Sequence, residues 1–318
     1  MDFLIRLVKN WTLPLAMLAG MSGYFVLAGI PALAPLKPAC LKLAGMLMPV
    51  LIFLMLFFTF CKIEPRELKP RRWHVSLLLI QVVLCLAAAL YMVWGGVRGD
   101  AQIVWEGVLA CLLCPTATAA AVVTGKLGGN AASLTTYTLE SNLLSAVLIT
   151  LLCPWVHPQP GIDWGEALGV IANKVGFLLI LPFLAAWAVR CWLPRVHARL
   201  VSIKDAAFYL WGISLALVTA QTVRTVVADA GESNLEIYVA SGALAVCCFK
   251  FAVGKAVGGH YGERISGGQA LGQKNTVFAI WMAFTYLSPM AAIGPGSYVL
   301  WQNTINSYQL WKKRKNAG

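Results

Sequence analysis

The chain has 318 residues, of which 59% are hydrophobic and only 12% are charged, with a formal net charge of +12. About a quarter of the residues of a soluble globular domain are charged, so this composition excludes that class and predicts an all-α integral membrane protein. The Lys and Arg residues are dispersed through short loops. The positive charge therefore indicates membrane topology and contact with anionic lipid, and no nucleic-acid partner is expected.

Ten apolar segments are each long enough, at about 20 residues, to cross a bilayer. Basic clusters follow the second, sixth and tenth segments, and with Arg6 and Lys9 they place both termini in the cytoplasm. We expect a single membrane domain, 1–318, in which residues 1–157 and 158–318 each hold five spans. An odd number of spans per half makes the second repeat inverted. The expected spans are residues 11–30, 41–61, 75–95, 103–124, 130–153, 165–189, 205–226, 235–258, 266–287 and 291–311.

Two polar, helix-breaking stretches, residues 114–142 and 272–303, interrupt this apolar pattern and resemble two copies of one element. Residues 137–142 (YTLESN) align with residues 298–303 (YVLWQN), and each copy follows an apolar segment broken by small and polar residues. Repeated broken helices in the two halves of a chain indicate a transporter binding site.

Charged residues lie deep within several predicted spans. Glu140 and Lys274 fall near the middle of the fifth and ninth spans, where a charge costs about 2.5–3.5 kcal/mol, so each needs a partner or a water-filled cavity. We expect Glu140 to be a candidate counter-ion for Lys274. Lys174 and Lys250 are further candidates for lining a cavity, whereas Lys255 is close enough to a span end to reach the interface.

The sequence gives little indication of a metal site or of enzymatic catalysis. Cys111 and Cys114 have the two-residue gap of a zinc site, but zinc needs further ligands and the four histidines are scattered. No nucleophile–base constellation is visible in the sequence. We therefore expect no metal, no cofactor and no enzymatic activity.

The broken elements resemble the bile acid:sodium symporter family. Residues 114–121 (CPTATAAA) are similar to the family's Cys-Pro-Gly-Gly-Thr-Ala-Ser-Asn motif on the fourth helix, and residues 272–276 (GQKNT) to its Gly-x-Gln-Asn-Ser motif on the ninth. The resemblance implies ten helices in two inverted repeats, with broken helices four and nine crossing near the membrane midplane. It also implies a bile-acid-like or small carboxylate substrate, and a bacterial inner membrane location.

The departures from the family pattern concern its sodium ligands. The family's Ser-Asn pair and a Glu on the ninth helix correspond here to Ala120, Ala121 and Ala270, and its Gln corresponds to Lys274. Alanine offers no side-chain oxygen, and hard cations need several oxygen ligands. We therefore expect a sodium-independent protein in which the Lys274 ammonium replaces a sodium ion.

The resulting hypothesis is a secondary active or facilitative transporter of organic anions that works by alternating access, with protons as a candidate coupling ion. Two other interpretations stay open: a cation–proton exchanger, and a transport-inactive membrane sensor with the same fold. The predicted substrate and coupling site consists of Lys274, Glu140, Asn142, Thr116, Thr118, Gln273, Asn275, Thr276, Gln302 and Asn303.

Overall fold

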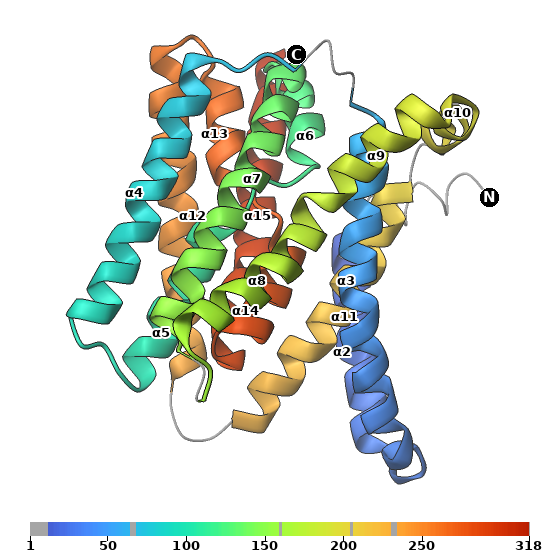
Figure 1. Ribbon diagram of the computed structural model, residues 1–318, viewed down its shortest axis with the longest axis vertical. Coiled ribbons are helices and arrows are strands. Elements are labelled where there is room, and N and C mark those ends of the chain that lie inside the picture. The colour runs from blue at the N-terminus through green and yellow to red at the C-terminus, as the bar shows by residue number, and fades with distance from the viewer. Residues whose placement is uncertain (1–11, 64–67, 159–160, 204–205, 230–233, 318) are drawn as a thin grey trace. The chain divides into compact units, whose positions relative to one another are not determined.

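The computed structural model describes residues 12–63, 68–158, 161–203, 206–229 and 234–317, and within these ranges the protein is built from helices and a single isolated β-bridge (Figure 1). The chain divides into two compact units. Unit 1 comprises Met1–Cys61 and Pro182–Ser233, and unit 2 comprises Lys62–Leu181 and Asn234–Gly318. Each unit thus takes segments from both halves of the chain, so the units do not follow the 1–157 and 158–318 division. The repeats themselves stay a prediction.

Unit 1 is a helical unit with an apolar core. In it, α11 packs against α2 and α3, and Ile52 and Leu56 of α3 are fully buried. Gly20 permits the close approach of α2 and α11, because a Cβ at this position would clash with the carbonyl oxygen of Ala216. Its elements are α2 (Thr12–Gly29), η1 (Pro31–Leu36), α3 (Lys37–Cys61), α10 (Pro194–Ser202), α11 (Ala206–Asp229) and most of α9 (Leu181–Trp192).

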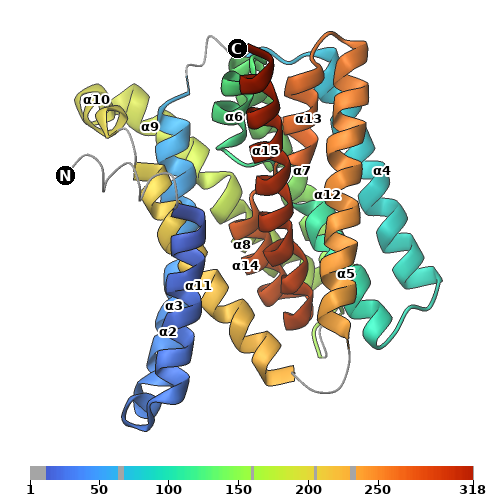
Figure 2. The same cartoon turned by 180° about the vertical axis from the view of Figure 1, so that it is seen from behind.

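Unit 2 contains the remaining helices, and both predicted broken elements belong to it. Figures 1 and 2 show α12 and α13 side by side. Glycines allow this contact, since a Cβ on Gly258 would lie 2.9 Å from the Cα of Gly267. The elements are α4 (Arg72–Trp94), α5 (Asp100–Leu113), α6 (Ala120–Leu127), α7 (Ala131–Val156), α8 (Trp164–Leu179), α12 (Leu235–His260), α13 (Arg264–Gly272), α14 (Thr276–Tyr286), η3 (Pro289–Ala292) and α15 (Ile293–Ala317).

Local sequence signals explain where α6 ends and α7 begins. Gly128 adopts a left-handed conformation (φ 87°), which stops α6, and the Lys313 ammonium donates to the carbonyl oxygen of Lys126 at 3.0 Å. Asn130 then caps α7, because its side-chain oxygen accepts a hydrogen bond from the backbone N–H of Ser133 at 3.0 Å. The polar stretch after the first break is therefore a tight connection between two helices.

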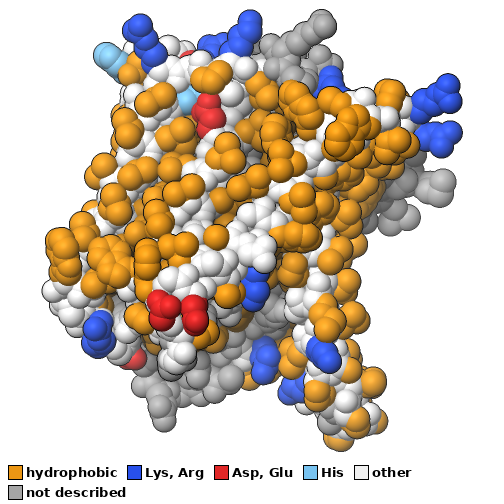
Figure 3. Space-filling view, viewed as in Figure 1, with side chains coloured by type: hydrophobic (Ala, Val, Ile, Leu, Met, Phe, Trp, Pro, Cys, Tyr) orange, Lys and Arg blue, Asp and Glu red, His pale blue; other side chains and the backbone are white. Residues whose placement is uncertain are grey.

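Five helices among the described residues are long and apolar enough to cross a membrane, or six if α8 and α9 form one broken span. Hydrophobic side chains cover most of the face in Figure 3, and large apolar residues such as Leu79 and Val83 of α4 are exposed. The protein is therefore membrane-embedded. The predicted count of ten spans and the inverted repeat are not confirmed, partly because helix breaks divide three of the expected spans into shorter pieces.

Candidate functional site

The two predicted broken elements are real breaks, and they meet each other. The first break separates α5 from α6, and the second separates α13 from α14. Thr116 and Lys274 form an antiparallel β-bridge between the two extended segments. The backbone N–H of Ala117 donates to Gln273 O at 3.0 Å, and that of Asn275 donates to Pro115 O at 2.9 Å. The pairing satisfies backbone groups that the breaks would otherwise leave buried without partners.

A buried lysine caps the end of α5. The last carbonyl groups of any helix lack intrahelical partners, and a break inside a protein buries them. Lys250 of α12 is 0% exposed, and its ammonium donates to Cys111 O at 3.0 Å and to Leu112 O at 3.3 Å. A cation at a helix C-terminus also interacts favourably with the helix dipole. Lys250 therefore stabilises the broken end of α5.

Neutral hydroxyl groups cap the end of α13 instead. The Thr116 hydroxyl donates to Ala270 O at 2.7 Å, and the Tyr298 hydroxyl donates to Gly272 O at 2.7 Å. Ser141 of α7 holds Thr116 in place, since its Oγ accepts from the Thr116 backbone N–H at 3.0 Å. The α13 end thus needs no charge to complete its hydrogen bonds.

Lys274 lies in the second break and is 1% exposed. Gln302 fixes its backbone, accepting from the Lys274 N–H at 2.8 Å and donating to its carbonyl at 3.2 Å. The ammonium itself makes one long contact, 3.3 Å, to the Oε1 atom of Gln81 on α4. Lys250 is near enough to act on it as a second positive charge. In the part of the chain that the structure describes, neither lysine has a carboxylate ion pair.

The expected pairing of Glu140 with Lys274 is corrected by the structure. Glu140 instead contacts His74 of α4, with 2.9 Å between Oε2 and Nδ1. His74 also meets Ser133, at 3.0 Å, and packs edge-to-face on Tyr137. Residues 133, 137 and 140 are spaced by one helical turn each, so they share the face of α7 that meets α4. Ser141, one residue on, is directed to the crossing.

Apart from Glu140, whose Oε2 contacts His74, three predicted site residues carry buried polar atoms that have no hydrogen-bond partner among the described residues. They are both amide atoms of Asn142, Oε1 of Gln273 and Nδ2 of Asn275. Such groups are rare in folded proteins and call for water, an ion or a ligand. These atoms give the crossing spare hydrogen-bonding capacity of both donor and acceptor type.

The remaining predicted site residues have smaller roles. Asn303 donates within its own helix, to Val299 O at 2.7 Å. Thr118 is half-buried beside the first break, and Thr276 is buried at the first residue of α14.

The three alanines at the expected sodium-ligand positions contribute only methyl groups to their surroundings. Ala120 and Ala270 are fully buried in an apolar cluster with Trp73 and Leu77, and Ala121 packs against it. The side chains at these positions therefore supply no oxygen that could bind a sodium ion.

Sequence reasoning missed His74, Gln81 and Ser145. Gln81 also donates to the Ser145 hydroxyl, at 3.4 Å, so it links Lys274 to α7. Gln81 stands in the middle of the apolar segment 75–95, and a polar side chain there is a signal that could have been used. His74 lies at the edge of the same segment, where the sequence carries no comparable signal.

A second buried carboxylate, Glu106 of α5, ties together three elements of unit 2. Its Oε1 lies 2.8 Å from Nδ1 of His157, the residue that follows α7, and its Oε2 accepts from the backbone N–H of Ser288 at 2.7 Å. The hydrogen bond to Glu106 raises the pKa of His157. This contact joins the end of α7 to the segment between α14 and η3.

Comparison with known proteins gives no assignment. No protein-family model matches the chain, and no curated protein sequence matches it significantly. Function must therefore be argued from the crossing itself.

Proposed function

We propose that the protein is a sodium-independent transporter of organic anions, in which the Lys274 ammonium stands where a related sodium-coupled transporter would bind sodium. The observation that carries the proposal is a pair of buried lysine side chains at the crossing of two broken helices. In the described ranges, no carboxylate is ion-paired to either lysine. The resemblance of residues 114–121 and 272–276 to the bile acid:sodium symporter motifs supports it.

The unbalanced charge favours an anionic ligand. A charge at membrane depth costs about 2.5–3.5 kcal/mol on insertion scales, and an anion held against it offsets that cost. An ammonium has three donors, and Lys274 uses one in a single contact of 3.3 Å. The unpartnered amide groups of Asn142 and Asn275 offer further hydrogen bonds to a carboxylate. We therefore propose a small or amphipathic carboxylate as the substrate class.

The alanines support independence from sodium. Sodium is a hard cation that needs several oxygen ligands, and Ala120, Ala121 and Ala270 contribute none. A buried lysine can also give up its proton, so Lys274 is the candidate carrier in a proton-coupled cycle. Glu140 is not a direct counter-ion of Lys274 in this scheme, because its carboxylate contacts His74.

The wider architecture belongs to the same proposal. It comprises ten spans in two inverted five-helix repeats, both termini in the cytoplasm, and a bacterial inner membrane location. The meeting of the two broken elements at Thr116 and Lys274 supports it, because repeated broken helices form the binding sites of transporters with inverted repeats.

Transport assays on the purified protein in liposomes test this function. Uptake of a panel of radiolabelled carboxylates, including bile acids and small keto acids, is measured with and without sodium and across a pH gradient. We expect uptake of at least one anion that persists without sodium and is lost in Lys274→Gln. The matched control is Lys174→Gln. Lys174 was a candidate for lining a cavity, but the structure leaves it exposed on α8, so its loss should leave uptake unchanged.

Each alternative gives a different pattern in the same assays. A strict sodium requirement contradicts the tethered-cation mechanism. Proton flux driven by sodium or potassium, without anion uptake, identifies a cation–proton exchanger. Anion binding without flux identifies a sensor with a transporter fold.

A further inference from the structure

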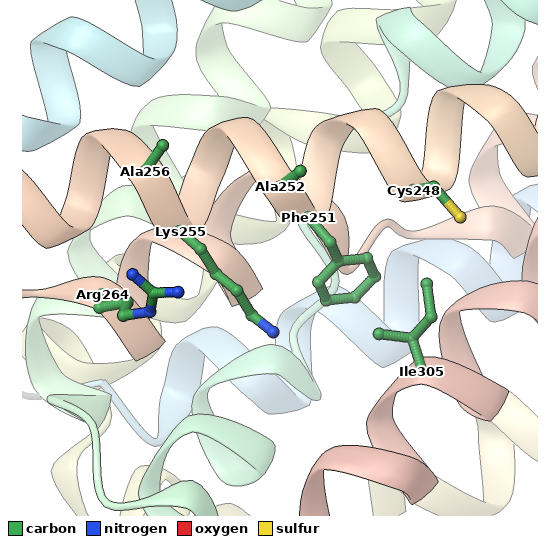
Figure 4. Close-up of a pocket in the computed structure, with 7 residues that line it drawn as sticks. All are labelled: Cys248, Phe251, Ala252, Lys255, Ala256, Arg264 and Ile305. Carbon is green, nitrogen blue, oxygen red and sulfur yellow. The ribbon is translucent and has the colours of Figure 1, made fainter.

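Unit 2 contains a pocket of about 450 Å³ that is separate from the residues of the helix crossing. It lies among α12, α13 and α15 (Figure 4). Cys248, Phe251 and Ile305 contribute an apolar wall, whereas Lys255 and Arg264 place positive charges in the same pocket. The side chains of Phe251 and Lys255 extend from α12 toward the space beside Ile305. The pocket is therefore amphipathic.

The packing of α12 against α15 sets the apolar end of the pocket. Further along α12, Cys247 and Tyr298 belong to one buried cluster, and the indole N–H of Trp301 donates to Ala240 O at 3.3 Å. These contacts hold the two helices together on that side. Toward Arg264, the first residue of α13, the space between them is open.

A glycine positions the lysine. A Cβ at Gly268 of α13 would lie 2.6 Å from Cγ of Lys255, so the lysine stem rests directly on the α13 backbone. The stem is half-buried while the ammonium remains at the pocket. The cation is thus held by packing along its aliphatic part.

The positive charges in and around the pocket are not balanced by acids. Arg264 and Lys312 are both close enough to repel Lys255, and the described part of the chain shows no ion pair for any of the three. The neighbouring Glu263 is occupied elsewhere, since it pairs with Arg71 at 2.9 Å and accepts from Ser266 at 2.7 Å. Charge complementarity therefore requires an anion.

We propose that this pocket binds an anionic phospholipid, with the phosphate on Lys255 and Arg264 and an acyl chain along Phe251 and Ile305. The outer face of α12 supports a lipid as the occupant, because Leu244 and Phe249 are large apolar residues exposed there. Basic pockets between transmembrane helices on the cytoplasmic side bind acidic headgroups. On the proposed topology, the turn between α12 and α13 is cytoplasmic. The lipid site takes its membrane orientation from the proposed topology, but it does not rest on anion transport at Lys274.

Lipid binding to the purified full-length protein tests the proposal. The amount of phosphatidylglycerol bound is measured by native mass spectrometry, with phosphatidylcholine as the neutral lipid and inorganic phosphate as the free anion. Loss of both charges in Lys255→Gln/Arg264→Gln should weaken phosphatidylglycerol binding about 30-fold, since each basic residue contributes about fivefold. The matched control, Lys69→Gln/Arg195→Gln, removes two exposed basic residues elsewhere and should bind as the wild type does.

A second variant separates the acyl chain from the charge. Ile305→Trp fills the apolar wall and keeps both cations, so we expect it to lose phosphatidylglycerol binding, and it provides the test if the charge variant does not fold. Equal phosphatidylglycerol binding by the wild type and the charge variant overturns the site. Displacement of phosphatidylglycerol by inorganic phosphate at equal affinity overturns the lipid assignment. Neither result depends on transport.

Discussion

The two helix breaks are closed in different ways, and the difference separates the two buried lysines. At the end of α5, the Lys250 ammonium donates to two backbone carbonyls. At the end of α13, the neutral hydroxyl groups of Thr116 and Tyr298 donate hydrogen bonds to the last backbone carbonyls. The Lys274 side chain is therefore not needed to close its own break, and it keeps a single contact with Gln81.

Under the proposed function, this contrast gives the two lysines different roles. Lys250 acts as a structural cation that replaces the missing intrahelical donors of α5. Lys274 is a buried cation whose donors are largely unused, which suits binding of an exchangeable anion. Substitutions should separate the two: one affects mainly stability, and the other mainly binding.

The largest loss of stability is expected for Lys250→Met. The substitution keeps most of the length of the side chain but leaves the Cys111 and Leu112 carbonyls buried without donors, which costs about 1–3 kcal/mol for each group. We expect a total loss of about 3 kcal/mol, because removing a buried charge offsets part of it. Thermal unfolding in detergent measures the effect, with Lys174→Met as the control for loss of an exposed lysine. An unchanged unfolding temperature contradicts the structural assignment.

Removing the neutral caps should have an intermediate effect. Tyr298→Phe leaves Gly272 O without its donor, and Thr116→Val leaves Ala270 O without its donor. We expect each to destabilise the protein by about 1–2 kcal/mol. The same unfolding assay checks this, and Tyr308→Phe, at an exposed position on α15, is the matched control. If neither substitution lowers the stability measured by unfolding, the two hydroxyl groups do not stabilise the broken end of α13.

Lys274→Met should change stability by less than about 1 kcal/mol, in either direction. The variant loses one long hydrogen bond to Gln81 but also the cost of burying a charge. The thermal unfolding of Lys274→Met and Lys250→Met, measured in the same assay, compares the contributions of the two lysines to stability. A loss as large as that of Lys250→Met means that Lys274 is also a structural cation.

The smallest change in stability is expected at His157, the residue that follows the C-terminus of α7. Its hydrogen bond to Glu106 raises the pKa of His157, so the contact stabilises the protein fully below the ordinary histidine pKa of about 6.5 and loses that contribution as the pH rises through the raised value. His157→Gln should therefore destabilise more at pH 6 than at pH 9. Because the His157 side chain is 34% exposed, the difference should stay below about 1 kcal/mol. A pH-independent difference contradicts the ionic character of the contact.

The sequence predicted the helix breaks well, because breaks have local causes. Pro115 and the small and polar residues beside it, like Gly272 and Asn275 in the second element, disfavour a continuous helix. The structure has both breaks where they were expected, and Thr116 of the first element forms a β-bridge with Lys274 of the second.

The partners of the charged residues could not be predicted, because they depend on which face of each helix meets its neighbour. Glu140 and Ser141 are adjacent in sequence, yet one contacts His74 on α4 and the other contacts Thr116 at the crossing. A rotation of about 100° per residue separates them, and pattern alone did not fix the orientation of α7. For the same reason, the sequence did not predict the contact between Gln81 and Lys274.

The most direct test of the central claim is equilibrium binding, in sodium-free buffer, of an anion identified by the uptake assays to Lys274→Met, with Lys174→Met as the control and a folding check on each sample. A charge-assisted contact is worth about 1.5–3 kcal/mol, so the account predicts binding about 10- to 100-fold weaker in Lys274→Met, with stability near that of the wild type. Undiminished binding by a folded Lys274→Met protein, or binding that appears only when sodium is added, would contradict the role of Lys274 as a tethered cation.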